Sequence, residues 1–277
     1  MKLPIANCRL PIAATRRAGI VPICNLQSAI GNRSAFTMVE IAISLAIIGF
    51  ALVAIIGVLP FGMSVQRENR EETIINQDAT YLIDAIRSGA RGLDNLTQSV
   101  MGITIVSNFN FNPVGYTNSY LNPANPPPFA LPNPSTFTLI NGERIIGLLS
   151  TPKYHGSSSN YVVAYVRALS GLAADKFPQN NSEVQQGAFT YRLITENVPL
   201  PVPPDYGINS SSRQLTHNLR ELRLSFRWPV LPSGKIGNGR QTFRTMVGGT
   251  LTNAPDSIQT NISLAWFFQP QTFVKAP

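Results

Sequence analysis

The sequence predicts an α+β fold, in which a long N-terminal membrane-spanning helix packs its C-terminal half on a mainly antiparallel β-sheet head. Three observations predict this fold: a run of 23 residues without a charged side chain, an amphipathic segment directly after it, and a series of short β-prone segments in the rest of the chain. With 277 residues and 44% hydrophobic content, the chain is long enough for one sizeable core and an extra element.

No charged side chain occurs in the 23 residues from Ile41 to Met63, which we call the uncharged run. As a helix that rises about 1.5 Å per residue it is roughly 35 Å long, which is enough to cross a bilayer. Helices buried in soluble proteins rarely remain apolar on every face over such a length. A cleavable secretory signal has a shorter apolar core, about 7–15 residues, followed by a small-x-small site, and this pattern does not occur here. The run therefore predicts a membrane span.

The basic residues gather before this run. Five of the 22 basic residues and none of the 14 acidic residues precede Phe36, so the chain from Phe36 onward carries a net charge of +3 instead of the +8 of the whole sequence. A lysine and arginine excess beside a membrane helix tends to stay in the cytoplasm. We therefore expect a single-pass membrane protein whose large C-terminal part is exported. The small remaining excess argues against nucleic acid as a partner.

After Met63 the chain is charged but keeps an apolar helical period. The apolar positions are spaced i, i+4, i+7, i+11 and i+18, at Ile75, Ala79, Leu82, Ile86 and Leu93. This spacing predicts an amphipathic helix. Its charged face is expected to be solvated or to face a partner, and it comprises Arg67, Glu68, Arg70, Glu71, Asp78, Arg87 and Arg91.

Proline and glycine positions set the expected limits of this helix. Pro60 lacks an amide donor and clashes with the preceding turn, which predicts a bend or a melted turn there. Gly89 and Gly92 interrupt the helical pattern and are expected to end it. We expect one helix from Phe36 to about Ala90, roughly 80 Å long.

From Val100 onward the sequence indicates strands. Asn141-Gly142 lies between two β-prone runs and predicts a tight hairpin turn. Four further strands are expected, at Tyr161–Ala168, Phe189–Thr195, Leu219–Trp228 and Ile262–Phe268. In the third of these, alternation places Leu222, Leu224 and Phe226 on one face and Arg223, Ser225 and Arg227 on the other. The apolar face needs a cover, which the amphipathic helix is expected to provide.

Two proline-dense stretches interrupt the strands. Pro113 to Pro134 contains seven prolines, and Pro199 to Pro204 contains four. Proline cannot donate to a sheet ladder and breaks a helix interior. Both stretches are expected to be extended surface loops.

Glu40 lies at the cytoplasmic edge of the uncharged run, where an acidic side chain is unfavourable unless it has a partner or reaches the interface. Its neighbourhood reads Ala35-Phe36-Thr37-Met38-Val39-Glu40. This segment resembles the processing motif of the type IV pilin-like and pseudopilin family: a small residue, Phe, Thr, two apolar residues and Glu. The family strongly prefers Gly where this chain has Ala35, the next smallest residue.

The resemblance implies that a prepilin peptidase/methyltransferase removes residues 1–35 by cutting between Ala35 and Phe36, and N-methylates Phe36. It implies a pilin-like lollipop fold with a membrane and assembly half (36–63), an amphipathic half (64–93) and a β-rich head (94–277). Glu40 is then expected to neutralise the N-terminal amine of a neighbouring pilin or pseudopilin subunit, because two opposite charges in a low dielectric each need the other. The alternative is that Glu40 only reaches toward the membrane interface.

Ala42, Ala46 and Gly49 lie at i, i+4 and i+7 of the uncharged run. A strip of small residues lets another helix approach closely, which favours packing in a filament core, although alanine and glycine are common in any membrane helix. The late segment from Arg223 to Val247, together with FALVAIIGVLPFGM, resembles the Verru/Chthon cassette protein B family, which is itself pilin-related.

The sequence contains no recognisable pattern for a zinc site or a phosphate-binding loop. The only histidines are His155 and His217, and both cysteines, Cys8 and Cys24, precede Phe36, so a tetrahedral zinc site lacks ligands. The loop from Gly234 to Arg240 lacks the spacing and the ending of a phosphate-binding loop. We expect no enzyme activity and no cofactor or metal, although an assembled calcium site of the kind found in some pseudopilin heads stays open.

The sequence thus predicts a structural subunit, a minor pilin or pseudopilin of a type IV pilus or type II secretion-like filament. One alternative is a DNA-uptake or adhesion tip pilin, with Arg223, Arg227, Arg240 and Arg244 as a basic patch. Another is an unprocessed single-pass anchor that displays an exported protein.

Overall fold

The structure is a computed structural model that describes residues 36–109, 115–170, 189–201, 211–254 and 265–275. The chain divides into two compact units, 1–59 and 60–277. Helix α1 (Met38–Ser88) contributes residues to both of them. It is continuous through Pro60, so the melted turn that a proline favours at this position is not present.

The amphipathic half of α1 packs in the second unit as the apolar spacing predicts. Ile75, Ala79, Leu82 and Ile86 are all fully buried. They belong to one cluster with the apolar side chains of the sheet. The helix ends at Gly89, whose φ of 62° is the left-handed conformation that glycine adopts readily.

Two hydrogen bonds outside the regular pattern of α1 close this end of the helix. The Gly89 amide donates to the carbonyl of Ile86 at 3.1 Å and the Ala90 amide donates to the carbonyl of Ala85 at 3.2 Å. Both bonds satisfy carbonyls that would otherwise lack a partner in the last turn. The prediction of one helix that ends near residue 90 is therefore confirmed.

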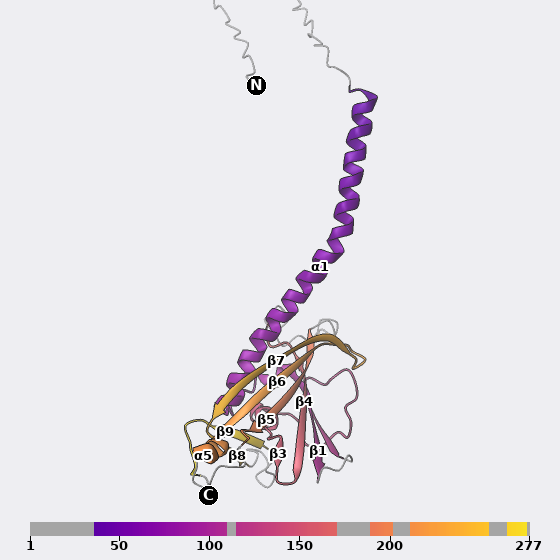
Figure 1. The fold of residues 1–277 in the computed structure, drawn as a ribbon. Helices are drawn as coiled ribbons and strands as arrows, with labels where there is room; N and C mark the ends of the chain where they lie inside the picture. The colour runs from indigo at the N-terminus through magenta and orange to yellow at the C-terminus, as the bar shows by residue number, and fades with distance from the viewer. Residues whose placement is uncertain (1–35, 110–114, 171–188, 202–210, 255–264, 276–277) are drawn as a thin grey trace, which may run out of the picture. The chain divides into compact units, whose positions relative to one another are not determined.

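The head is built on an antiparallel sheet in the order β2-β1-β4-β5-β6-β7, with β3 paired to β4. Figure 1 labels each of these strands except β2. Its strands are β1 (Val100–Phe109), β2 (Tyr116–Leu121), β3 (Tyr154–His155), β4 (Ser158–Arg167), β5 (Thr190–Pro199), β6 (Leu219–Val230) and β7 (Ile236–Gly248). A second sheet pairs β8 (Thr250–Ala254) with β9 (Ala265–Gln269). Three short helices complete the described residues: α2 (Leu96–Ser99), α3 (Gly142–Leu149) and α5 (Ser211–Asn218).

The sheet has an inner face, which α1 covers, and an outer face. On β6 the inner residues Leu222, Leu224 and Phe226 are fully buried, as their alternation predicts. Gln241 of β7 donates to Asn76 of α1 at 3.0 Å, which places the helix along the inner face. The α+β prediction of a long helix whose C-terminal half packs on a mainly antiparallel sheet is therefore confirmed.

Three of the predicted strands are confirmed by β4, β5 and β6. The fourth, Ile262–Phe268, is confirmed from residue 265 as β9, and its first residues lie outside the described residues.

The predicted Asn141-Gly142 hairpin is wrong. Asn141 is the N-cap of α3: its side-chain oxygen accepts a hydrogen bond from the Arg144 amide at 2.9 Å, and its φ is −145°. Gly142 is needed for a different reason, because a Cβ there would meet the carbonyl of Leu93. The dipeptide therefore begins a helix against a neighbouring segment, and the β-prone run after it is helical and buried.

The first proline-dense stretch is only in part a loop. It contains β2, and its later residues lie on the outer face of β1 and β4. There Leu131 is 8% exposed and lies where a Cβ on Gly102 would be, and Phe129 packs edge-on against Tyr165 with ring centroids 4.9 Å apart. In the second stretch Pro199 ends β5, and Pro203 and Pro204 lie outside the described residues.

Asp78 corrects the expected charged face of α1. It is 1% exposed and accepts hydrogen bonds from the amides of Leu169 and Ser170, both at 2.9 Å. It also accepts from the Ser170 hydroxyl at 2.6 Å and the Tyr191 hydroxyl at 3.0 Å. Asp78 therefore joins the helix to the ends of β4 and β5 instead of facing solvent.

Candidate functional site

The apolar half of α1 exposes its large hydrophobic side chains. Every large hydrophobic residue from Phe36 to Met63 is at least half exposed, with Phe36 at 79%. In the second half of the same helix Ile75, Ala79, Leu82, Ala85 and Ile86 are buried. The described residues contain one helix long and apolar enough to cross a membrane, and none of its most apolar window is buried within the protein. The exposed half is consistent with a single membrane span.

Thr37 and Glu40 form a reciprocal cap at the start of this helix. The Glu40 amide donates to the Thr37 hydroxyl oxygen at 3.3 Å, and the Thr37 amide donates to Oε2 of Glu40 at 3.2 Å. Each side chain thus satisfies an amide that the helix leaves without a partner. This arrangement is the capping box, in which a Ser or Thr is followed three residues later by a Glu or Gln.

The cap uses one of the two carboxylate oxygens of Glu40. Thr37 contacts Oε2 through both its amide and its hydroxyl, and no hydrogen bond or ion pair within the described residues involves Oε1. Glu40 is exposed. A cation brought by another molecule can therefore reach Oε1 while the cap stays intact. Sequence reasoning noted the acid but missed the cap, which the Thr-x-x-Glu spacing indicates.

The other predicted site residues lie at or beside this helix start. Ala42, Ala46 and Gly49 are exposed, and a Cβ on Gly49 would meet nothing within 4 Å. The side chains of the strip are therefore accessible to another helix, and its packing role stays a prediction. Ala35, on the other side of the predicted cut, lies outside the described residues.

The four arginines of the alternative basic patch come together on the outer face of β6 and β7. Arg223 is paired directly with Arg244, and Arg227 with Arg240. A fifth arginine, Arg192 of β5, is paired with Arg227 on its other side. Sequence reasoning missed Arg192, although alternation in FTYRLIT places it opposite the buried Tyr191 and Leu193.

Acidic residues compensate only one end of this patch. Arg223 bonds Glu221 at 2.5 Å and lies 3.9 Å from Glu196. The hydrogen bond from Arg223 lowers the pKa of Glu221. Within the described residues Arg192, Arg227 and Arg240 form no ion pair or hydrogen bond.

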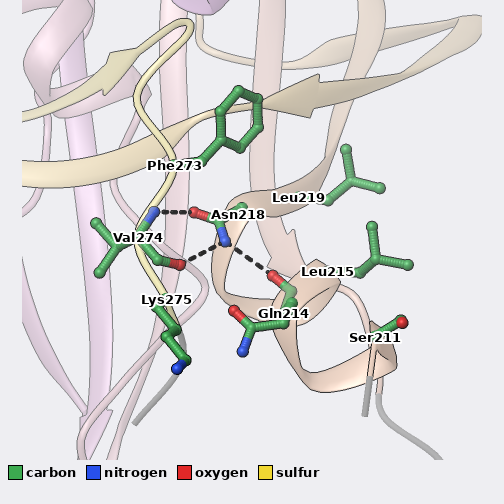
Figure 2. A pocket seen from close by; sticks show the side chains of 8 residues that line it. All are labelled: Ser211, Gln214, Leu215, Asn218, Leu219, Phe273, Val274 and Lys275. Atoms are coloured by element: carbon green, nitrogen blue, oxygen red, sulfur yellow. Dashed lines mark hydrogen bonds between the residues drawn. The ribbon is translucent and has the colours of Figure 1, made fainter. Parts of the chain in front are cut away.

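A surface hollow of about 530 Å³ lies between α5 and the C-terminal segment (Figure 2). Its apolar lining includes Leu215, Phe273 and Val274. Asn218 holds the two sides together, because its amide nitrogen donates to the Val274 carbonyl at 2.8 Å and its oxygen accepts from the Val274 amide at 2.7 Å. The central polar group is thus used within the fold, and the lining offers a single charged side chain, Lys275.

Two titratable groups of the head, Asp78 and Tyr191, are buried and bonded within the fold. Burial raises the pKa of Asp78, and burial together with the neighbouring Asp78 carboxylate raises the pKa of Tyr191 well above its usual value. The two hydrogen-bond each other inside the core, and neither of them lines this hollow. Among the residues that the structure describes, no three His, Cys, Asp or Glu side chains are grouped as a metal site.

Comparison with known proteins found no matching family model, no matching curated protein and no matching solved structure.

Proposed function

We propose that this chain is a structural filament subunit, a minor pilin or pseudopilin of a type IV pilus or type II secretion-like filament. In this proposal a prepilin peptidase cuts between Ala35 and Phe36 and methylates the new amine. The helix from Phe36 to Met63 first anchors the subunit in the inner membrane, with the head in the periplasm, and then packs in the filament core.

The observation that carries the proposal is the free Oε1 of Glu40 at the start of an exposed apolar helix. A carboxylate in a low dielectric is strongly unfavourable unless a cation compensates it. The residues of this helix that the structure describes supply no cation near Glu40, because its first lysine or arginine is Arg67. The N-terminal amine of another processed subunit has the required charge and emerges four residues from a glutamate of its own.

The exposed strip of Ala42, Ala46 and Gly49 adds support, because it lets a second helix approach closely enough for such a pair to form. The exposed apolar side chains around the strip are compatible with both states of the subunit. Lipid covers them before assembly and neighbouring helices cover them afterward.

The negative charge of Glu40 can be tested separately from its role in the capping box. Glu40→Gln retains a side chain that caps the helix but removes the charge. We expect the variant to be processed and membrane-bound, and to enter filaments at least about tenfold less, since an unpaired amine would be buried. Thr37→Ala is the control, because it removes the hydroxyl of the cap and leaves the charge, and it should assemble nearly normally. Normal filament incorporation of Glu40→Gln would refute the charge-pairing role.

The grouping of arginines on the outer face favours one second candidate, a tip pilin whose head binds DNA. It predicts salt-dependent retention of DNA by the protein, because phosphate contacts release counterions. Such contacts weaken between about 50 and about 200 mM salt. DNA retention that stays unchanged over this range would exclude the DNA-binding tip pilin. The third candidate, an unprocessed anchor, predicts that residues 1–35 stay attached.

A further inference from the structure

Three arginines stand side by side across the outer face of the head, and we name them the arginine row: Arg192, Arg227 and Arg240. The register of β5, β6 and β7 places Arg227 directly opposite both of the others. Arg227 and Arg240 are exposed and Arg192 is half-buried. Neighbouring strands lie about 4.8 Å apart, so the row presents three positive charges over roughly 10 Å.

The row is unfavourable for the isolated head. Like charges directly opposite on neighbouring strands repel each other and destabilise the sheet. Within the described residues no acid approaches the row, whereas Arg223, on the same face and strand as Arg227, has both Glu221 and Glu196. Packing does not account for the row, because two of its three side chains are exposed. An anionic partner would remove the repulsion.

The same unit carries a complementary acidic feature on α1. Glu68 and Glu72 are exposed and lie at i and i+4, where like charges repel. Glu71 is already bonded to Arg67 at 2.8 Å, and no ion pair within the described residues reaches Glu68 or Glu72. We name these two residues the acidic pair. Their Cβ atoms are about 5–6 Å apart, which matches the spacing between neighbouring arginines of the row.

We propose that the arginine row of one copy binds the acidic pair of a second copy of this chain. This inference rests on the proposed function and names the contact between neighbouring heads and helices. The row and the pair are different surfaces of the molecule, so the contact is head-to-tail. A head-to-tail contact that does not close into a ring propagates as an open filament.

Nucleic acid fits the row less well. The chain from Phe36 onward carries a net charge of only +3, and at the end of the patch where Glu196 and Glu221 neutralise Arg223 a phosphate chain that extends past the row would gain little attraction. The two carboxylates of the acidic pair fit the short length of the row. They occur on the chain itself, at a spacing that matches the row.

The test uses full-length chains with two different tags, co-expressed and purified together in detergent. Two double variants reverse the charges, one in the row (Arg227→Glu/Arg240→Glu) and one in the acidic pair (Glu68→Arg/Glu72→Arg). Each should reduce co-purification of the two tagged copies by about tenfold, because like charges then meet at the contact. The chain that carries all four substitutions should recover most of the wild-type association, since the charges are complementary again. This recovery also shows that the reduced association does not come from misfolding.

Arg244→Glu is the matched control for Arg240→Glu, because it makes the same charge change on the same strand and face but outside the row. It should leave association unchanged. Normal co-purification of Arg227→Glu/Arg240→Glu would overturn the inference, as would a four-substitution chain that does not recover. Unchanged association combined with lost DNA retention would assign the row to nucleic acid and would also overturn it.

Mass spectrometry of the N-terminus separates this inference from the proposed function. If Phe36 is the methylated first residue and wild-type copies associate independently of the row, only the inference fails. If the first 35 residues remain and wild-type copies do not associate, the proposed function fails and the inference fails with it.

Discussion

The contact of Asp78 with the sheet is the feature of the head whose loss can be estimated most directly. Its carboxylate is 1% exposed and accepts four hydrogen bonds, two at each oxygen. In Asp78→Asn the amide group replaces one oxygen, so two donors lose their acceptor. Each buried donor without a partner costs about 1–3 kcal/mol. The relief of a buried charge offsets part of this, which leaves a destabilisation of about 2–4 kcal/mol.

Urea unfolding of the detergent-solubilised chain, followed by tryptophan fluorescence, measures this change. Trp228 is 8% exposed in the folded head and reports its unfolding. Asp84→Asn is the control, because Asp84 is exposed on the same helix, and it should change the free energy of unfolding by no more than about 0.5 kcal/mol. An Asp78→Asn chain within about 0.5 kcal/mol of the wild type would refute the role given to these hydrogen bonds.

The difference in unfolding free energy between the wild type and Asp78→Asn should also depend on pH. Burial raises the pKa of Asp78 above its usual value of 3.8, and the hydrogen bonds from Ser170, Leu169 and Tyr191 only partly oppose this increase. Because the folded pKa is the higher one, the associated stability is fully present below pH 3.8 and is lost as the pH rises through the folded pKa. The difference in unfolding free energy between wild type and Asp78→Asn should therefore shrink as the pH rises through that interval, and a difference that grows would contradict the assignment.

Two further substitutions test local structure. Gly89→Ala should destabilise the head by more than about 2 kcal/mol, since a Cβ at positive φ would also meet the carbonyl of Phe268, whereas Gly92→Ala, with open space, should be neutral in the same unfolding assay. Asn141→Ala should cost about 1 kcal/mol by removing the cap of α3. Asn95→Ala is its control, because the side chain of Asn95 makes no capping bond in α2; equal losses at the two asparagines would contradict the capping role.

The elements that were predictable from sequence are those in which one period extends over many residues. The apolar repeat of Ile75, Ala79 and Leu82 needs only one covering surface, so it predicts both the helix and its buried face. The alternation at Leu222, Leu224 and Phe226 does the same for β6. In each case the local pattern and the tertiary environment favour the same structure.

The failures occurred where distant residues decide the structure. Asp78 has the charge of a surface residue, and its partners Ser170 and Tyr191 are 92 and 113 residues away along the chain. Gly142 is required by the approach of Leu93, and a dipeptide pattern does not contain that contact. The arginine row depends on how three strands pair with one another. The alternation of faces within each strand can be read from the sequence, but the register between strands cannot.

The candidate site was predictable to the extent that it is local. The Thr37 to Glu40 spacing, the uncharged run and the small-residue strip are all contiguous in sequence, and the structure adds the cap and the unengaged carboxylate oxygen. Within the described residues no hydrogen bond or ion pair involves that oxygen, and in the proposed function its partner comes from a second subunit. Experiments on the assembled protein must identify it.

The central claim is that processing releases an amine that pairs with Glu40 of a neighbouring subunit. Mass spectrometry of the N-terminal peptide from membrane-extracted protein tests its first requirement directly. The account predicts a chain that begins at N-methylated Phe36. A purified chain that keeps residues 1–35 would contradict it.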